Sequence, residues 1–214
     1  MIISEQKPFE EILGFLEGEE KVFIVGCELC ATLCQTGGEE QVKEMEAKLE
    51  EAGKTVTGWI ILNPACHILE AKRGFREKKE AVNSADSLLV MTCGTGVQSA
   101  MEASNKLVHP ALNTVFLGAI KRFGQYEERC SLCGECLLDI MGGICPITRC
   151  SKGLLNGPCG GSQDGKCEVD PSIPCAWQSI IERLTKLGQL DRLEKIVAPK
   201  KWKDSLIAGL PVRR

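Results

Sequence analysis

The sequence predicts an α/β protein in which a small Rossmann-like parallel sheet is followed by a cysteine-rich, irregular metal-binding module and a C-terminal helix. Up to about residue 120, short apolar runs alternate with helical segments, which is typical of a parallel sheet covered on both faces. Between residues 130 and 175, Gly, Pro and Cys dominate, and neither the sheet period nor the helix period persists. We therefore predict a Rossmann-like domain over residues 1–125. Residues 126–214 are predicted to form a metal module with a helix and a basic tail.

Four strands are predicted in the first domain, each from a largely apolar run, over residues 22–25, 56–62, 87–91 and 114–117. Helices are predicted between them over residues 38–52, 67–83 and from 94 to about 107. The first of these helices has one apolar face, with Thr36 as a start signal and Gly53 as a stop signal. A last amphipathic helix is predicted over residues 177–197. The basic tail beyond it has apolar residues spaced to pack on another surface: Trp202, Leu206, Ile207 and Leu210.

The composition is that of an ordinary globular protein, with 43% hydrophobic and 26% charged residues in 214. The net charge of −3 argues against nucleic acid as a main partner. No signal-peptide pattern is visible, and no apolar run approaches the roughly 20 residues that span a bilayer. A cytoplasmic location is therefore expected. Because disulfides are rarely kept there, and because thirteen is an odd number, the thirteen cysteines are expected to bind metal.

Five cysteines follow the ends of the first three predicted strands: Cys27, Cys30, Cys34, Cys66 and Cys93. Since the carboxyl ends of neighbouring parallel strands line one crevice, three loops would bring five sulfurs to one edge of the sheet. Cluster iron is held by four thiolates, so one of the five is expected to be spare. The alternative interpretation is that these cysteines are small buried hydrophobic side chains.

The turn from Cys93 to Gly96 resembles a dinucleotide-binding loop, with Gly94 and Gly96 as its candidate cofactor-binding residues. Ser99, however, stands where the third glycine is expected, and no acidic residue about twenty positions on is paired with a strand end. The turn therefore lacks two parts of a nicotinamide site. The two histidines, His67 and His109, are interpreted as structural residues rather than metal ligands.

The remaining eight cysteines lie in the second domain. Cys130, Cys133 and Cys136 have the spacing of the first three ligands of a bacterial ferredoxin cluster. A fourth ligand is expected after three intervening residues, but here eight residues separate Cys136 from the next cysteine. Eight thiolates could serve two four-thiolate centres. An iron–sulfur cluster is favoured for the first trio, whereas iron and zinc both remain open for the last five: Cys145, Cys150, Cys159, Cys167 and Cys175.

Three motifs in this domain are similar to a known family: Cys145-Pro146-Ile147-Thr148-Arg149-Cys150, Asn156-Gly157-Pro158-Cys159-Gly160-Gly161 and Gly165-Lys166-Cys167-Glu168-Val169. They resemble the cysteine-rich domain named for the C-terminal regions of methylenetetrahydrofolate reductase. Gly26-Cys27-x-x-Cys30 with Thr36-Gly37-Gly38 resembles the small-subunit form of that family, so the resemblance covers nearly the whole chain. It implies a partner subunit, a TIM barrel carrying FMN or FAD, on which methylenetetrahydrofolate is reduced to methyltetrahydrofolate.

Taken together, these features predict an electron-transfer subunit with two 4Fe-4S clusters that relay electrons to or from the flavin of the partner. The chain is too short for both a TIM barrel, typically about 250 residues, and the cysteine module, which agrees with a separate flavin subunit. Further electron-transfer proteins could also be partners. One alternative is a structural assembly subunit in which zinc or a non-redox cluster shapes a docking surface. A second alternative is a free-standing enzyme with an open iron site for a small substrate.

Overall fold

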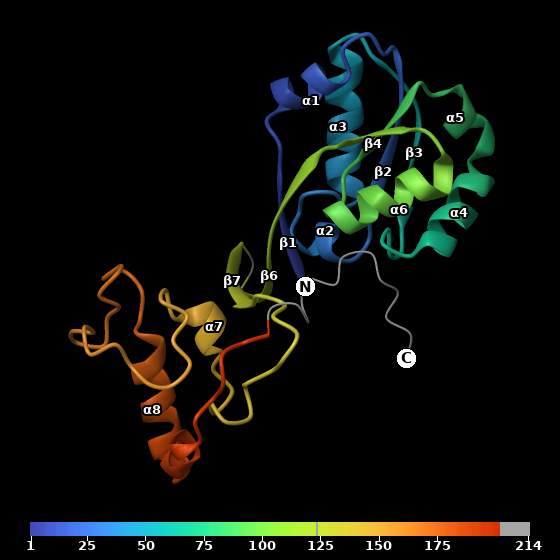
Figure 1. Ribbon diagram of the computed structural model, residues 1–214. Coiled ribbons are helices and arrows are strands. Elements are labelled where there is room, and N and C mark those ends of the chain that lie inside the picture. Colours follow the sequence, from blue (N-terminus) through green and yellow to red (C-terminus); the bar gives the residue numbers. More distant parts are fainter. Residues whose placement is uncertain (123, 202–214) are drawn as a thin grey trace. The chain divides into compact units, whose positions relative to one another are not determined.

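The computed structural model describes residues 1–122 and 124–201 of the chain. The chain divides into two compact units. Unit 1 consists of Met1–Phe116 and Arg122–Tyr126, and unit 2 consists of Leu117–Lys121 and the chain from Glu127 onward. Unit 1 contains the layered α/β structure, whereas unit 2 is mostly irregular chain with one longer helix (Figure 1).

Unit 1 is built on a four-stranded parallel sheet with the strand order β3-β2-β4-β5. The strands are β2 (Lys21–Cys27), β3 (Thr55–Leu62), β4 (Ser87–Val90) and β5 (Leu107–Pro110). In the register of the central strand, Cys27 lies opposite Leu62 of β3, and Val25 lies opposite Val90 of β4. Residues 22–25 have no exposed surface, as expected of a parallel strand covered on both faces. The predicted α/β class with a parallel sheet is confirmed.

Helices cover both faces of this sheet (Figure 1). They are α1 (Phe9–Phe15), α2 (Cys30–Leu33), α3 (Glu39–Glu51), α4 (Ile68–Glu77), α5 (Lys79–Ser84) and α6 (Gly94–Ser104). Trp59 and Ile60, two successive residues of β3, contact helices on opposite faces of the sheet. The ring of Trp59 lies 5.6 Å from the ammonium group of Lys43 in α3. Ile60, by contrast, packs so closely on Gly74 of α4 that a Cβ added there would lie 2.7 Å from its Cδ1.

A second, antiparallel sheet has the strand order β1-β6-β7, from β1 (Ile2–Gln6), β6 (Leu112–Arg122) and β7 (Gln125–Cys130). The sequence pattern predicts neither β1 nor β7. The predicted fourth parallel strand, residues 114–117, is wrong, because these residues belong to β6. The fourth parallel strand is β5, in which Leu107 pairs with Ser87. Its four residues include His109 and Pro110, so they lack the continuous apolar run from which buried strands are recognised.

The helices of unit 1 depart from prediction at their ends. The helix predicted over residues 67–83 is two helices, α4 and α5, that meet at Lys78. No apolar residue lies between Phe75 and Ala81 to hold one continuous helix on the sheet. The helix predicted to reach Leu107 ends at Ser104, because Asn105 takes a left-handed φ of 53°. α3 begins after Gly38 rather than at Thr36.

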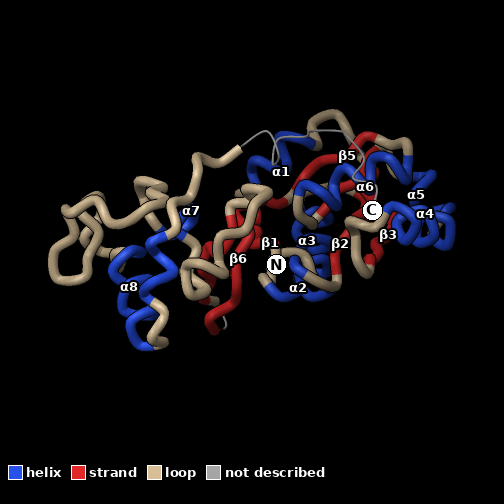
Figure 2. Tube along the Cα trace, turned by 60° about the horizontal axis from the view of Figure 1, so that its bottom comes forward, coloured by secondary structure: helices blue, strands red, loops and turns tan. Residues whose placement is uncertain are grey.

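Unit 2 has little regular structure between β7 and its long helix, as the loop colour of Figure 2 shows. Its helices are α7 (Pro146–Arg149), α8 (Ala176–Lys186) and a 3₁₀ turn at Leu190–Glu194. The helix predicted over residues 177–197 therefore ends early, where Gly188 takes a φ of 64°. The apolar residues of the predicted tail lie outside the described residues: Trp202, Leu206, Ile207 and Leu210.

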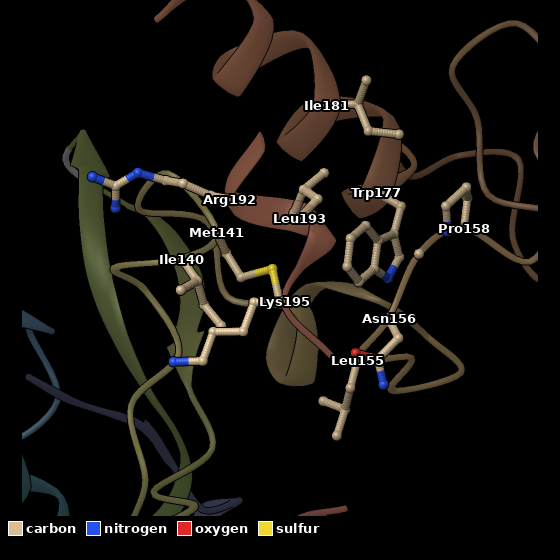
Figure 3. A pocket seen from close by; sticks show the side chains of 11 residues that line it. Ile140, Met141, Leu155, Asn156, Pro158, Trp177, Ile181, Arg192, Leu193 and Lys195 are labelled. Carbon is tan, nitrogen blue, oxygen red and sulfur yellow. The ribbon is translucent and has the colours of Figure 1, made fainter. Parts of the chain in front are cut away.

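The core of unit 2 is a small apolar cluster around α8, made by Met141, Cys175, Trp177, Ile180 and Leu184. Figure 3 shows the indole of Trp177 beside Leu193 and Met141 at the edge of a cavity of about 60 Å³. The indole Nε1 donates a hydrogen bond to the Leu154 carbonyl at 3.0 Å. Over residues 1–122 and 124–201, no helix is long and apolar enough to cross a membrane.

Candidate metal sites

The carboxyl ends of β2, β3 and β4 carry the cysteines of unit 1. Cys27 is the last residue of β2, Cys66 lies in the turn after β3, and Cys93 is the N-cap residue of α6 after β4. Cys30 opens the short helix α2, directly beyond the end of β2. Because β3, β2 and β4 are neighbours in the sheet, all four cysteines lie along one edge.

The charge environment of the Cys66 thiol includes the other three cysteines of this edge. Burial raises the pKa of the Cys66 thiol, and negative charge on Cys93, then Cys27, then Cys30 raises it further. The thiol of Cys66 therefore lies within the electrostatic reach of the other three. A cation bound among them would reverse this effect, because thiolates are the form that ligates metal.

Cys34, the fifth cysteine of this group, lies in a different environment. It is the C-cap residue of α2, it is 7% exposed, and its Sγ donates a hydrogen bond to the carbonyl of Ile2 in β1 at 3.7 Å. Burial is the main cause of the raised pKa of Cys34, while hydrogen bonding to Ser4 of β1 lowers it. Cys34 thus packs against β1, and negative charge on Cys30 also raises its pKa, so its thiol stays within the electrostatic reach of Cys30.

Close backbone packing holds the loops of this edge together. The amide of Cys27 donates to the Gly37 carbonyl at 2.9 Å, and the hydroxyl of Thr32 donates to the Cys27 carbonyl at 2.8 Å. A Cβ added at Gly37 would lie 1.9 Å from the carbonyl oxygen of Met91, which follows β4. The loop after α2 therefore runs directly against the end of β4, and a side chain at position 37 would part them.

The two glycines of the predicted dinucleotide loop differ in their surroundings. The amide of Gly94 donates to the Thr114 hydroxyl at 2.8 Å, a bond that uses only the backbone of the glycine. A Cβ at Gly96 would lie 2.4 Å from Thr92 Oγ1 and 3.2 Å from the Cβ of Ala65, in the turn that carries Cys66. Close packing therefore accounts for the glycine at position 96 but not for the one at position 94.

Both histidines have partners within the protein. His67 is the N-cap of α4, and its Nδ1 accepts a hydrogen bond from the amide of Glu70 at 3.2 Å. His109 Nε2 lies 3.0 Å from the carboxylate of Glu19, and its ring stacks on Phe15 with the ring centroids 6.2 Å apart. These contacts fit the structural roles that the sequence suggests.

In unit 2, four cysteines line a cavity of about 340 Å³: Cys130, Cys133, Cys136 and Cys145. The rest of its lining is largely apolar and includes Leu132, Leu137 and Ile147. Leu132 takes a φ of 53°, and its amide lies 3.4 Å from Cys130 Sγ as a hydrogen-bond donor. Left-handed backbone next to a sulfur turns amides toward it, which suits an anionic thiolate. The cavity brings the ferredoxin-like trio together with Cys145, which follows Cys136 after eight intervening residues.

The last four cysteines line a second and much smaller cavity of about 20 Å³: Cys150, Cys159, Cys167 and Cys175. Arg149 and Lys152 also lie in its wall. The cysteine spacing does not point to these two cations, although Arg149 precedes Cys150 and Lys152 follows it by two residues. Within residues 1–122 and 124–201, no three Cys, His, Asp or Glu side chains are close enough to chelate an ion as the side chains stand. Metal binding in either unit therefore stays a prediction.

Comparison with known proteins links unit 2 to one family. Residues 109–203 match the family model described as methylene-tetrahydrofolate reductase C terminal. This span includes all eight cysteines of unit 2 and is somewhat less than half of the chain. The predicted relationship to methylenetetrahydrofolate reductase is supported for this part of the chain. Searches of curated proteins and of solved structures gave no match.

Proposed function

We propose that the chain is an iron–sulfur electron-transfer subunit that works with a flavin-carrying methylenetetrahydrofolate reductase subunit, similar to the small subunit called MetV. The observation that carries the proposal is the cavity of about 340 Å³ lined by Cys130, Cys133, Cys136 and Cys145. It lies within the span that matches the methylene-tetrahydrofolate reductase model. Four thiols around an apolar cavity are the donor set of a four-iron cluster.

In unit 1, the proposed ligands are Cys27, Cys30, Cys66 and Cys93. Cys27 ends β2, Cys66 follows β3, and Cys93 follows β4 as the N-cap residue of α6. The parallel sheet therefore fixes the separation of these three cysteines. This gives rigidity to a site that must hold its geometry in two oxidation states. A four-iron cluster at either place would supply one-electron transfer.

The residues around each group control charge and water. In unit 2, Leu132, Leu137 and Ile147 form much of the cavity wall and give the thiols largely apolar surroundings. In unit 1, the short helix α2 and the N-cap of α6 present backbone amides near the cysteines, and amide hydrogen bonds stabilise thiolate charge. Reduction of methylenetetrahydrofolate requires two electrons and two protons. The folate and flavin chemistry is assigned to the partner, where one-electron carriers can charge the flavin stepwise.

Anaerobic purification of the full chain with its flavoprotein partner tests this proposal. We expect iron and acid-labile sulfide, and EPR signals after reduction. Cys66→Ala and Cys136→Ala should each remove one cluster and slow flavin reduction, whereas Cys34→Ala should retain both clusters. A complex with no reducible iron refutes the proposal. If Cys66→Ala abolishes assembly but leaves electron transfer in the remaining complex unchanged, the structural assembly alternative is correct.

A further inference from the structure

The last four cysteines come together from four separate parts of unit 2. Cys150 is the C-cap residue of α7, Cys175 is the N-cap residue of α8, and Cys159 and Cys167 lie in the loops between these helices. All four line the cavity of about 20 Å³. This convergence was not evident from their spacing, because the intervals between them are long and unequal.

Backbone hydrogen bonds hold three of these positions. The amide of Cys175 donates to the Gly165 carbonyl at 2.7 Å, and the amide of Cys167 donates to the Ile173 carbonyl at 3.1 Å. Gln163 and Lys166 form an antiparallel bridge, as do Lys166 and Pro174. The bridged segment therefore places Cys167 beside the start of α8, where Cys175 lies. Cys150 is held by its amide, which donates to the Pro146 carbonyl at 3.1 Å.

The size of the cavity limits what it can hold. A cavity needs about 10–15 Å³ to hold one water molecule. At about 20 Å³, the small cavity therefore has room for one ion or molecule of about the size of water. A four-iron cluster has four iron and four sulfide atoms. The other four-cysteine cavity, at about 340 Å³, is more than tenfold larger. The two groups of four thiols therefore suit cofactors of different size.

The surroundings of the small cavity suit thiolates. Arg149 and Lys152 line it, together with the one carboxylate of Glu168, which is ion-paired with Lys152. Cys167 Sγ lies 3.6 Å from Ser151 Oγ. The backbone amides of Val169 and Asp170 also lie within hydrogen-bonding reach of the Cys167 sulfur. A sulfur atom that accepts hydrogen bonds from the amides of its own loop is oriented as a thiolate ligand before the metal binds.

We propose that Cys150, Cys159, Cys167 and Cys175 bind a single zinc ion in a closed, tetrahedral, structural site, and not an iron–sulfur cluster. Zinc in structural sites takes four thiolates at about 2.3 Å and leaves no open position. Closing four thiols on one ion requires side-chain rotation, since the thiols are not at chelating distance as they stand. The ion would join α7, the loop of Cys159, the bridged segment and α8. The inference shares with the proposed function only the premise that the cysteines of unit 2 bind metal.

Metal analysis of the full chain, purified anaerobically from cells grown with both metals, tests the proposal. We expect one zinc ion per chain, with a zinc-edge absorption spectrum that fits four sulfur neighbours at about 2.3 Å and no neighbouring metal. Cys159→Ser should lower zinc content at least about tenfold without lowering iron. The matched control, Cys136→Ser, should lower iron and leave zinc unchanged. Cys159→His should keep zinc, with three sulfur neighbours and one nitrogen, because zinc accepts imidazole.

The spectrum of the unaltered chain keeps the test decisive if Cys159→Ser does not fold. Absence of zinc from that chain, or loss of iron in the folded Cys159→Ser or Cys159→His variant, overturns the proposal in favour of a further cluster. Its failure is distinct from failure of the proposed function. The zinc inference is read from zinc content and coordination, whereas electron transfer is read from reducible iron and flavin reduction.

Discussion

Alanine at Gly96 should destabilise unit 1, whereas alanine at Gly94 should not. The added Cβ at position 96 would lie 2.4 Å from Thr92 Oγ1 and 2.9 Å from Thr92 Cβ, closer than non-bonded atoms approach. Thr92 is 1% exposed and has no free space into which to turn. Overpacking of this kind costs about 1–3 kcal/mol, and the better helix propensity of alanine returns up to about 1 kcal/mol. We therefore expect a net loss of about 1–2 kcal/mol.

Gly94 is the matched control, because it lies in the same turn of α6. Its added Cβ would meet only Thr114 Oγ1, at the ordinary distance of 3.6 Å. Gly94→Ala should therefore leave stability within about 0.5 kcal/mol of the unaltered chain. A double variant, Thr92→Ala with Gly96→Ala, should recover part of the loss, because it removes the hydroxyl that collides.

Hydrogen exchange of peptides that cover β2 and β4 measures the effect within unit 1. A loss of about 1–2 kcal/mol corresponds to exchange that is about 5–30 times faster for the most protected amides. Equal protection in Gly96→Ala and the unaltered chain would refute the packing argument. Equal destabilisation by Gly94→Ala and Gly96→Ala would do so too. A nucleotide-dependent gain in protection that both substitutions abolish would restore the dinucleotide-loop interpretation.

Three further predictions concern other parts of the molecule. Asn156→Ala should lower the free energy of unfolding by about 1 kcal/mol and speed hydrogen exchange around Val197. The side-chain amide of Asn156 donates to the Val197 carbonyl at 2.9 Å, and its Oδ1 accepts from the Val197 backbone amide at 2.7 Å. Unchanged exchange there would contradict it. Asp86 accepts hydrogen bonds from the amides of Lys21 and Glu20, which lower its pKa, so its contribution is present at neutral pH and lost as pH falls through the lowered value. Asp86→Ala should therefore lower Tm at pH 7 and have a smaller effect near pH 3, where a constant difference would count against the argument. Removing metal with a chelator should abolish exchange protection in unit 2 and preserve it in β2 and β4, and loss of both together would be the contrary result.

The sequence predicts the parallel sheet well because its central strands are buried on both faces. Residues 22–25 and 88–90 are continuous apolar runs, and the structure buries every one of them. β5 escapes the same reasoning because its short run contains His109 and Pro110, and its pairing with β4 is decided by the preceding helix and not by local pattern. β1 and β7 are not predicted because an edge strand of a small antiparallel sheet needs no strong apolar pattern.

The candidate sites divide in the same way. The sequence predicts parallel strands, and parallel strands bring Cys27, Cys66 and Cys93 to one edge of the sheet. That Cys34 packs against β1 could not be predicted, because β1 itself was not. In unit 2, no period relates Cys150 to Cys159, Cys167 and Cys175. Their grouping depends on turns in which glycines such as Gly160 and Gly165 take positive φ, and it becomes visible only in three dimensions.

The two units must therefore respond differently when a cysteine is lost. Unit 1 has an extensive apolar core that includes Phe23, Leu49 and Leu88, so its fold does not depend on a metal at its edge. Among the described residues of unit 2, the buried cluster has five members, and one of them is Cys175, a proposed metal ligand. A segment with so small a core is stabilised largely by what its side chains bind. Loss of electron transfer in Cys66→Ala can consequently be interpreted as loss of a redox centre. The same loss in Cys159→Ser or Cys136→Ser can be interpreted only beside a measurement of folding in unit 2, since there the fold depends on its metals as well as on its small core.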